Sequence, residues 1–359
     1  MFDKSIGSGT YLQNDILFLL NKTNIVETPV NQKEIEIQLN KKHYSEMISR
    51  EESPSKEYMD LYQDALAINK ERFASNILSL SKSISKYLDS EITLVSLVRA
   101  GVPIGVLLNR VLQNEKRKVN HYGISIIRDK GIDRHALNFI LERHAPESII
   151  FIDGWTGKGA IANELEASLS NDTRFKTKPK LAVLTDPCGR AWLSAGHDDW
   201  VIPCGFLGSI VSGLVSRSIW KGDHEPHACM INDHLRQADI SLKFINVIEK
   251  EVAKIKYLKE IEPLTDINRI YIQNSALQVI AEVAQKYNIQ NLNRIKPGIS
   301  EATRAVLRRA PERIILGKTN NNDIKALKYL ANQRNVKIER SLVDLGPYQV
   351  ITLIKGINE

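Results

Sequence analysis

The chain of 359 residues has room for two or three domains, and its 43% hydrophobic and 25% charged residues are typical of a globular protein in water. No apolar run approaches the ~18 residues of a membrane span, and the first residues, Met1 to Lys4, do not resemble a signal peptide. Three widely spaced cysteines, Cys188, Cys204 and Cys229, suit free thiols in a reducing compartment. We therefore expect a cytoplasmic protein without a membrane partner.

The net charge of +7 is unevenly distributed along the chain. Residues 264–359 hold 15 Lys or Arg and 8 Asp or Glu, whereas the preceding 263 residues hold 34 of each. All of the excess positive charge therefore lies in the last quarter of the sequence. Such an asymmetry favours a neutral body that carries a basic binding module.

The first 90 residues are predicted to form a mostly helical extension. Helical apolar spacing covers residues 15–20 and 58–88, and the second stretch is expected to divide into two helices. Between them lies His43-Tyr44-Ser45-Glu46-Met47, with more acids nearby. This cluster either lines the rim of a pocket or begins a solvated helix.

Two buried strands are each followed by a loop suited to anions. Residues 92–98 lead into Arg99-Ala100-Gly101, and a helix is expected near Pro103. Residues 148–152 lead into a second loop and a helix over residues 160–169. That loop is Asp153-Gly154-Trp155-Thr156-Gly157-Lys158-Gly159.

Glycines after a strand allow backbone N–H groups to turn inward, and the next helix adds its positive end. Phosphate is therefore the predicted ligand of both loops. The glycine spacing of the second loop matches neither the Walker loop nor the dinucleotide fingerprint.

Residues 119–127 are predicted to form a third strand, which leads into a loop with Arg128, Lys130 and Arg134 and then into a helix that ends near Arg143. These cations either close over a bound anion or are simply solvated. Further along, residues 180–185 and 200–203 are expected to be strands.

Cys229 follows His227 at two residues, which leaves a metal site, a thiol nucleophile and a half-buried structural thiol as alternatives. A long helix is predicted over residues 242–260, and Pro263 marks a domain boundary.

The last 95 or so residues are predicted to form a compact α/β/α sandwich. We expect strands at 268–272, 312–316, 336–339 and 349–354, and helices at 275–287, 301–309 and 323–334. Ser275 and Ser300 are the expected N-caps of the first two of these helices. Arg304 and Arg308 lie one turn apart on one helix face, with Arg309 beside them. The same stretch adds Lys296 and Lys318 and a sharp turn at Pro297-Gly298, so it either binds a partner or forms a solvated basic helix.

In order along the chain, these motifs resemble the bacterial phosphoribosyltransferases of tellurium-resistance and stress operons. The resemblance rests on the His43 to Met47 motif, both phosphate loops, residues 121–133 and Ser212-Gly213-Leu214-Val215-Ser216-Arg217. Such proteins often end in a Pelota-type RNA-binding domain, and residues 297–304 with Leu307-Arg308-Arg309 look like its signature. The family is also labelled as StiP-type cysteine proteases.

The resemblance implies a class I phosphoribosyltransferase-like fold. This is a doubly wound parallel sheet with a helical lead-in (residues 1–90), a core domain (91–262) and a C-terminal Pelota-type α/β/α sandwich (263–359). It implies transfer of the phosphoribosyl group of phosphoribosyl pyrophosphate to an unidentified base. Mg²⁺ would bind mainly through that substrate, and a homo-oligomer is compatible with the family.

The residue roles that the resemblance implies fall into three groups. Asp153 and Arg99 would be catalytic. The expected substrate-binding residues are Ala100, Gly101, Arg128, Lys130, Gly154, Trp155, Thr156, Gly157, Lys158 and Gly159. The expected RNA-binding residues are Lys296, Gly298, Arg304, Arg308 and Arg309. A nucleotide sensor that regulates RNA without turnover is the alternative, and the cysteine protease is a more distant one.

Overall fold

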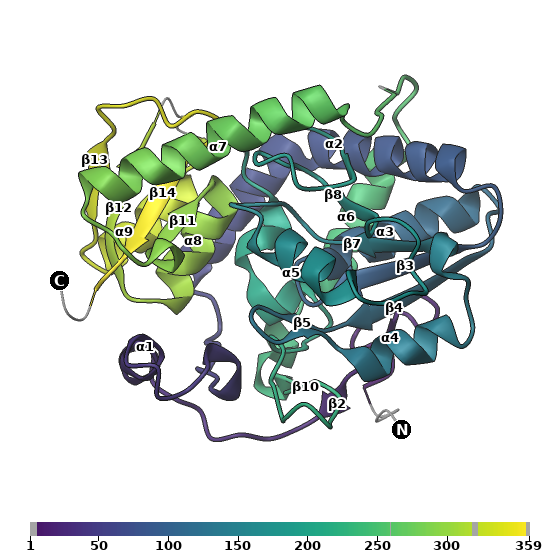
Figure 1. The fold of residues 1–359 in the computed structure, drawn as a ribbon, viewed down its shortest axis with the longest axis horizontal. Helices are drawn as coiled ribbons and strands as arrows, with labels where there is room; N and C mark the ends of the chain where they lie inside the picture. The colour runs from purple at the N-terminus through teal and green to yellow at the C-terminus, as the bar shows by residue number, and fades with distance from the viewer. Residues whose placement is uncertain (1–5, 259, 318–321, 357–359) are drawn as a thin grey trace.

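The computed structural model describes residues 6–258, 260–317 and 322–356, and it divides into two units, each built around one sheet (Figure 1). The larger unit contains a six-stranded sheet in the order β1-β4-β3-β7-β8-β9, and every adjacent pair is parallel. Its strands are β1 (Leu17–Phe18), β4 (Val119–Ile124), β3 (Ile92–Leu97), β7 (Ile149–Ile152), β8 (Leu181–Val183) and β9 (Leu193–Ser194). The predicted α/β fold with a parallel sheet is confirmed.

Helices cover both faces of this sheet because its central strands are apolar on both sides. Every residue of β3 and of β7 is buried. One face packs against α2 (Lys56–Tyr87), α3 (Gly101–Asn114) and α6 (Ser241–Val252). The other face packs against α4 (Arg134–Leu141) and α5 (Ala160–Leu169). The carboxyl ends of β3 and β7 are left to receive a ligand, as in open α/β sheets generally.

The C-terminal unit is a four-stranded mixed sheet between two helical layers. Its strand order is β11-β14-β12-β13. The strands are β11 (Ile295–Pro297), β14 (Val350–Ile354), β12 (Pro311–Leu316) and β13 (Lys337–Arg340). Helix α7 (Asp266–Lys286) covers one face, and α8 (Ile299–Arg308) with α9 (Lys325–Gln333) covers the other, toward the first unit.

Shorter elements connect these layers. The short strands are β2 (Asn21–Lys22), β5 (Ile126–Ile127), β6 (Gly131–Ile132) and β10 (Ala228–Cys229), and one further helix is α1 (Val30–Gln38). The single-turn helices are η1 (Tyr44–Glu46), η2 (Pro146–Ser148), η3 (Pro203–Phe206), η4 (Gly208–Val211), η5 (Asp233–Ala238) and η6 (Leu292–Arg294). Within the described ranges, no helix is long and apolar enough to cross a membrane.

Several predicted elements were wrong in the first unit. Residues 15–20 contain the edge strand β1 instead of a helix, because six residues are too few to fix a helical period. Helix α2 is one continuous helix of 32 residues, stabilised by packing on α3 and α6, and not two. The expected strand at 200–203 is irregular chain that enters η3, and α6 ends at Val252, earlier than expected.

The beginning of the C-terminal unit was also assigned wrongly. The strand expected at 268–272 lies inside α7, whose N-cap is Thr265 and not Ser275. Its Oγ1 accepts from the Asn268 N–H at 3.3 Å. Helix α8 begins at Ile299 after Gly298, so Ser300 is not its cap. Lys318 lies outside the described residues.

The cap of α8 comes from the other unit. The buried carboxylate of Asp199 accepts from the Ile299 N–H at 2.9 and 3.1 Å and from the Gln349 N–H at 2.9 Å. The carboxyl group also lies at the positive end of the helix, and burial raises its pKa to about 7. One residue of the first unit therefore holds α8 and the start of β14 in place.

We predict that Asp199→Ala destabilises the protein by about 2–5 kcal/mol, because two buried N–H groups lose their acceptor. Asp199→Asn, which keeps one acceptor oxygen, should lose less. Urea unfolding measures both free energies.

Asp198→Ala is the matched control, because Asp198 forms an exposed ion pair with Arg72 and should contribute under about 1 kcal/mol. A loss in Asp199→Ala no greater than in this control would contradict the assigned role.

Candidate functional site

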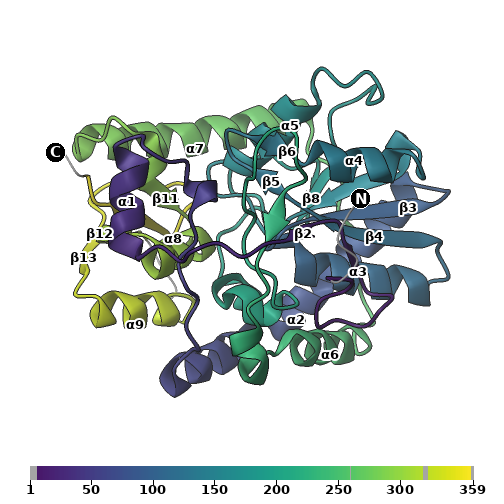
Figure 2. The ribbon, with the colours of Figure 1, turned by 90° about the horizontal axis from the view of Figure 1, so that it is seen from below.

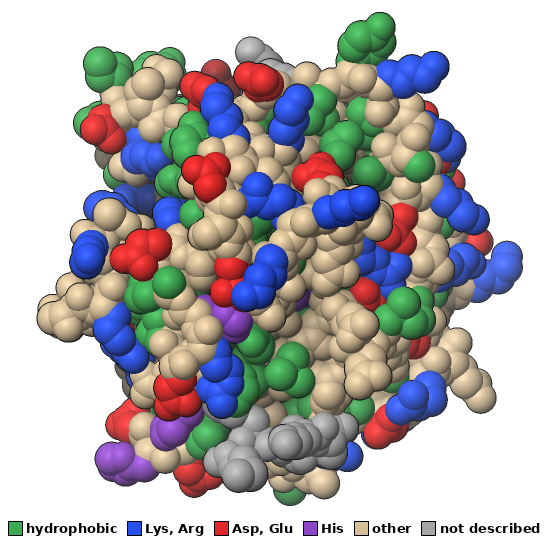
Figure 3. All heavy atoms as spheres, turned by 90° about the vertical axis from the view of Figure 1, so that its right-hand side faces the viewer, with side chains coloured by type: hydrophobic (Ala, Val, Ile, Leu, Met, Phe, Trp, Pro, Cys, Tyr) green, Lys and Arg blue, Asp and Glu red, His purple; other side chains and the backbone are tan. Residues whose placement is uncertain are grey.

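A cavity of 330 Å³ opens at the carboxyl ends of β3 and β7, and α8 of the C-terminal unit forms its opposite wall. Its charged lining is dominated by nine cations against two acids, Asp153 and Glu301. The cations are Lys33, Arg99, Arg128, Lys158, Arg217, Lys296, Arg304, Arg308 and Arg309. On the face shown in Figure 3, by contrast, basic and acidic side chains are interspersed. The lining of this cleft alone carries seven more cations than acids.

The two predicted phosphate loops lie against each other at the floor of the cleft. A Cβ on Gly101 would lie 2.0 Å from the Ile152 carbonyl oxygen, so only glycine allows this approach. In the second loop Gly159 has φ of 83° and precedes the first turn of α5. Both loops therefore present backbone and a helix start to the same space.

Asp153 is the acid of the second loop. Its Oδ1 accepts from the Gly154 N–H at 2.8 Å. Burial raises the pKa of this carboxyl to about 6. Lys158 lies in the same loop, and burial, with Lys296 nearby, lowers the pKa of its ammonium to about 7. Both groups therefore titrate near neutral pH.

Three arginines reach the cleft with little hydrogen bonding of their own. Arg99 is 5% exposed, and its Nη1 donates to Glu51 at 2.5 Å and to the Val215 carbonyl at 3.3 Å. Its Nε and Nη2 are buried without a partner. Arg304 lies over the Trp155 ring at 5.2 Å, and no described residue accepts a hydrogen bond from Arg304 or Arg308. Buried donors in native proteins are normally paired, so a partner is missing here.

Residues 23–55, here called the strap, run past the cleft from the first unit to the C-terminal unit. In Figure 2 helix α1 of the strap lies in front of the C-terminal unit. Glu34 accepts two hydrogen bonds of 2.6 Å from Arg309, and Gln38 donates to the Lys355 carbonyl at 2.7 Å. Tyr44 of the strap packs between the guanidinium groups of Arg128 and Arg217, at 5.2 and 5.5 Å from its ring. The strap therefore adds a third wall.

Most of the expected site residues come together in this cleft. Those that line it are Arg99, Ala100, Arg128, Asp153, Trp155, Thr156, Gly157, Lys158, Gly159, Lys296, Arg304, Arg308 and Arg309. Gly101, Gly154 and Gly298 support the loops and the helix start from behind. Lys130 lies on the Trp220 ring at 3.7 Å instead. The expected RNA-binding arginines thus face the first unit and not the outer surface.

Sequence reasoning named none of the charged lining residues Lys33, Arg217 and Glu301 as site residues, and it offered Tyr44 only as part of a cluster at the rim of a pocket. Tyr44, Arg217 and Glu301 stand in motifs that the sequence analysis singled out, but no spacing showed that they meet. Lys33 had no signal, since the weakly amphipathic helix α1 is placed by its contacts with the C-terminal unit.

The three cysteines are buried and free. The Nδ1 of His227 lies 2.7 Å from Ser125 Oγ, and the backbone N–H of His227 donates to the carboxylate of Asp133. These hydrogen bonds hold β10 against the start of α4. Burial raises the pKa of the Cys188 thiol above its usual range, and that of Cys204 to about 12. Among the described residues, no three His, Cys, Asp or Glu side chains form a group that could hold a metal ion.

Taken together, the chain is a two-unit α/β protein with a cationic cleft at the carboxyl edge of a parallel sheet. Residues 9–249 match the model of a family described as "Tellurite-like stress resistance cysteine protease StiP". Residues 274–356 match the model of the PELOTA RNA binding domain. The chain is 42% identical over 365 residues to a protein of Acinetobacter baylyi named "Cysteine protease StiP", which covers 98% of this chain and 95% of the relative. The chain belongs to the StiP family.

Solved structures of hypoxanthine phosphoribosyltransferase from Trypanosoma cruzi are similar only at a distance. One is 17% identical with a TM-score of 0.27 and covers 33% of this chain and 67% of that one. Another is 13% identical with a TM-score of 0.26 and covers 40% and 82%. Likenesses this weak say nothing about activity.

These comparisons overturn the activity expected from the loops. The family and the curated relative are named as cysteine proteases, which are hydrolases and not glycosyltransferases. The expected phosphoribosyl transfer is therefore wrong as the function of this chain. The two loops had indicated a phosphate-binding geometry, which does not by itself define a reaction.

We predict that binding of sulfate, an anion that does not titrate near neutral pH, weakens as the pH rises from about 5.5 to about 8.5. Lys158 is charged below its pKa of about 7, and Asp153 is neutral below its pKa of about 6. The cleft is therefore most positive at low pH. Calorimetric titrations across this range measure the effect.

Between about pH 5.5 and 7 the double variant Asp153→Asn, Lys158→Met should show a nearly constant affinity, because Lys33, with a pKa of about 8, stays charged there. An unchanged pH dependence in this variant would show that other groups are responsible.

Proposed function

We propose that the cleft binds a phosphate-rich anion, held by both units at once. The observation that carries this proposal is the pair of buried, unpartnered nitrogens of Arg99, Nε and Nη2, in a cavity that Arg304 and Arg308 also line. A buried donor without an acceptor costs about 1–3 kcal/mol, and more when it is charged. A bound polyanion would remove that cost.

The remaining lining suits the same ligand. Lys158 and Lys296 add charge from opposite walls, and Thr156 to Gly159 bring a glycine-rich loop to the start of α5. Gly101 lets the two loops come close enough to share one anion, and Gly154 of the second loop lies beside Ala100 of the first. A divalent cation such as Mg²⁺ would enter mainly on the ligand's own oxygens, with Asp153 as the carboxylate beside it.

We propose further that the C-terminal unit binds RNA, the activity for which its domain family is named. The cationic residues of α8 that would serve this purpose, Arg304, Arg308 and Arg309, already face the cleft. RNA bound by these arginines would therefore lie in or at the mouth of the cleft.

We predict that Arg304→Ala weakens binding of pyrophosphate or tripolyphosphate roughly tenfold to a hundredfold. Charged hydrogen bonds of this kind contribute about 1.5–3 kcal/mol. Isothermal titration of the full chain measures the affinities.

Lys337→Ala is the matched control, because its exposed side chain on β13 carries the same charge away from the cleft. Equal affinities for the wild type and Arg304→Ala, or no binding of either anion by the wild type, would refute the proposed site.

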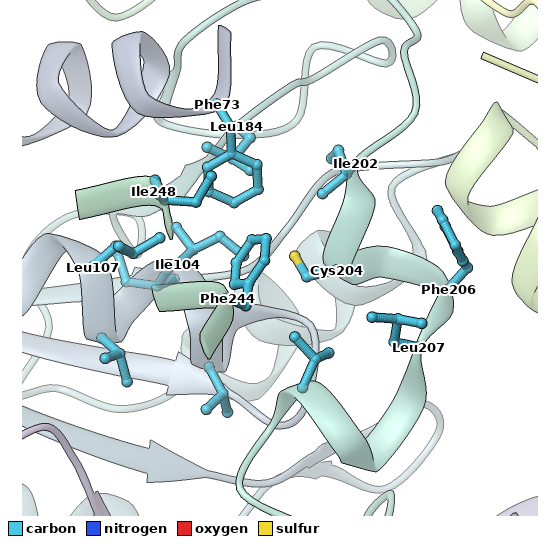
Figure 4. Packing of buried hydrophobic residues seen from close by; sticks show 14 of the residues in the cluster. Phe73, Ile104, Leu107, Leu184, Ile202, Cys204, Phe206, Leu207, Phe244 and Ile248 are labelled. Carbon is cyan, nitrogen blue, oxygen red and sulfur yellow. The ribbon is translucent and has the colours of Figure 1, made fainter. Parts of the chain in front are cut away.

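The second candidate is the thiol-dependent hydrolysis for which the family is named. Cys204 is the cysteine that geometry favours, because it lines a 20 Å³ cavity together with Arg99, Arg304 and Arg308. The rest of its surroundings are apolar, as Figure 4 shows with Ile202 and Phe244 nearby. Burial keeps this thiol protonated at neutral pH, and the charge of Arg304 acts in the opposite direction. Nucleophilic attack would require the cavity to open.

If this chain hydrolyses peptides through Cys204, Cys204→Ser should abolish cleavage of fluorescently labelled casein. Cys188→Ser and Cys229→Ser should retain it, because neither thiol lines the cleft. Melting temperatures of the three variants control for folding. Persistent cleavage in Cys204→Ser would exclude this cysteine.

A further inference from the structure

A second, larger cavity lies beside the cationic cleft. It has a volume of 650 Å³ and is bounded by the strap, by η3 and by helices α8 and α9. Three aromatic residues line it, Tyr58, Phe206 and Tyr329. Tyr58 and Tyr329 lie roughly parallel with ring centroids 6.4 Å apart, and Tyr329 is the least buried of the three. This cavity therefore combines apolar surface with an opening to solvent.

The two cavities share three cationic side chains. Lys33 of the strap, Arg217 of the first unit and Arg308 of α8 line both spaces. Burial, together with Arg217 and Arg308, lowers the pKa of Lys33 to about 8, which reflects the positive potential at this point. Arg308 donates no hydrogen bond to any described residue, so it is available to a ligand on either side.

The acids of the second cavity are already engaged. Glu51 accepts from Arg99 at 2.5 Å and from the Ser209 N–H at 2.9 Å. Glu27 and Glu52 each lie 3.8 Å from Arg50. Lys33, Arg217 and Arg308, which line both cavities, therefore face the second cavity without forming an ion pair with one of these acids.

The C-terminal unit does not easily leave this place to bind RNA elsewhere. Ile299, Ala302 and Val306 of α8 belong to the same buried apolar cluster as Trp200 and Phe206 of the first unit. Asp199 caps α8, and Glu34 binds Arg309. Separation would expose this apolar surface and several buried charges at once.

We propose that the end of a single RNA strand occupies both cavities, with its terminal phosphate in the cationic cleft and the adjoining nucleotides in the second cavity. This inference rests on the proposed anion site and names its ligand class. A backbone phosphate of the strand at the junction of the two cavities would contact Lys33, Arg217 and Arg308. Bases would lie against the aromatic side, where stacking tolerates any sequence.

The dimensions favour a strand end over a duplex. The two cavities provide 330 and 650 Å³, which suits one to a few nucleotides. A double helix presents phosphates on an outer surface and could not enter a passage bounded by the strap. The proposed ligand is therefore an unpaired terminus with a phosphate monoester.

The test compares fluorescent hexauridylates that carry a 5′-phosphate, a 3′-phosphate or only hydroxyl ends, and a blunt RNA duplex, by anisotropy with the full chain. A phosphorylated end should bind at least about tenfold more tightly than the hydroxyl form. Pyrophosphate should displace the bound strand. If the 5′-phosphorylated and 3′-phosphorylated strands bind with different affinities, the tighter one shows which end of the strand lies in the cationic cleft.

Variants separate the two cavities. Arg50→Glu and Tyr329→Ser change the second cavity and should weaken the oligonucleotide about tenfold while pyrophosphate affinity stays constant. Lys337→Glu on β13 is the control for added negative charge. Arg308→Ala should weaken both ligands and reduce the salt slope for the strand by about 0.7.

Three outcomes would overturn the inference while pyrophosphate still binds. These are equal binding of phosphorylated and hydroxyl strands, a strand that pyrophosphate does not displace, and a duplex that binds as tightly as the single strand. If pyrophosphate itself fails to bind, the proposed anion site is wrong, and the inference fails with it.

Discussion

The buried carboxylate of Asp199 fixes the position on which the rest of the structure depends. It pairs with backbone N–H groups of two separate segments of the C-terminal unit, Ile299 and Gln349. Because a carboxylate at a helix start constrains both direction and distance, α8 has one orientation over the sheet. That orientation turns Arg304 and Arg308 toward the phosphate loops. The cleft is therefore a product of the joint between units and not of either unit alone.

Concentrating so many cations in one cleft is unfavourable for stability. Burial and neighbouring cations lower the pKa values of Lys158, Lys296 and Arg304, which shows that each charge is held at a cost. Proteins retain such arrangements where function requires them, and apolar packing elsewhere compensates. Here the compensation comes from the continuous apolar cluster that joins α2, α3 and α6 to α8 and α9.

The sequence predicted the parts of the fold that local rules determine. The all-buried strands β3 and β7 and the glycine loops after them were recognisable, because apolar runs and glycine spacing are local signals. Long-range partners were not recognisable. Helix α8 has its cap 100 residues away at Asp199, so Ser300 was a reasonable but wrong choice. In α7, Ile270, Tyr271 and Ile272 suggested a strand, although the helix extends through them.

For the site, the sequence predicted which side chains are positively charged, but it did not predict the direction in which they point. Arg304 and Arg308 were identified as one basic helix face, but only the docked structure shows that this face turns inward. Lys33 reaches the cleft because Glu34 binds Arg309, a contact between residues 275 positions apart. The two loops could not predict which reaction the protein catalyses, since many chemistries use the same phosphate-binding geometry.

Helix α2 has a wider consequence for how this protein can change and be divided. Its 32 residues span about 48 Å and pack against α3 and α6 of the first unit and α9 of the second. Because α2 contacts helices of both units, unfolding of either unit would expose part of its buried face. Exchange of either half between relatives would therefore have to preserve the same face of α2.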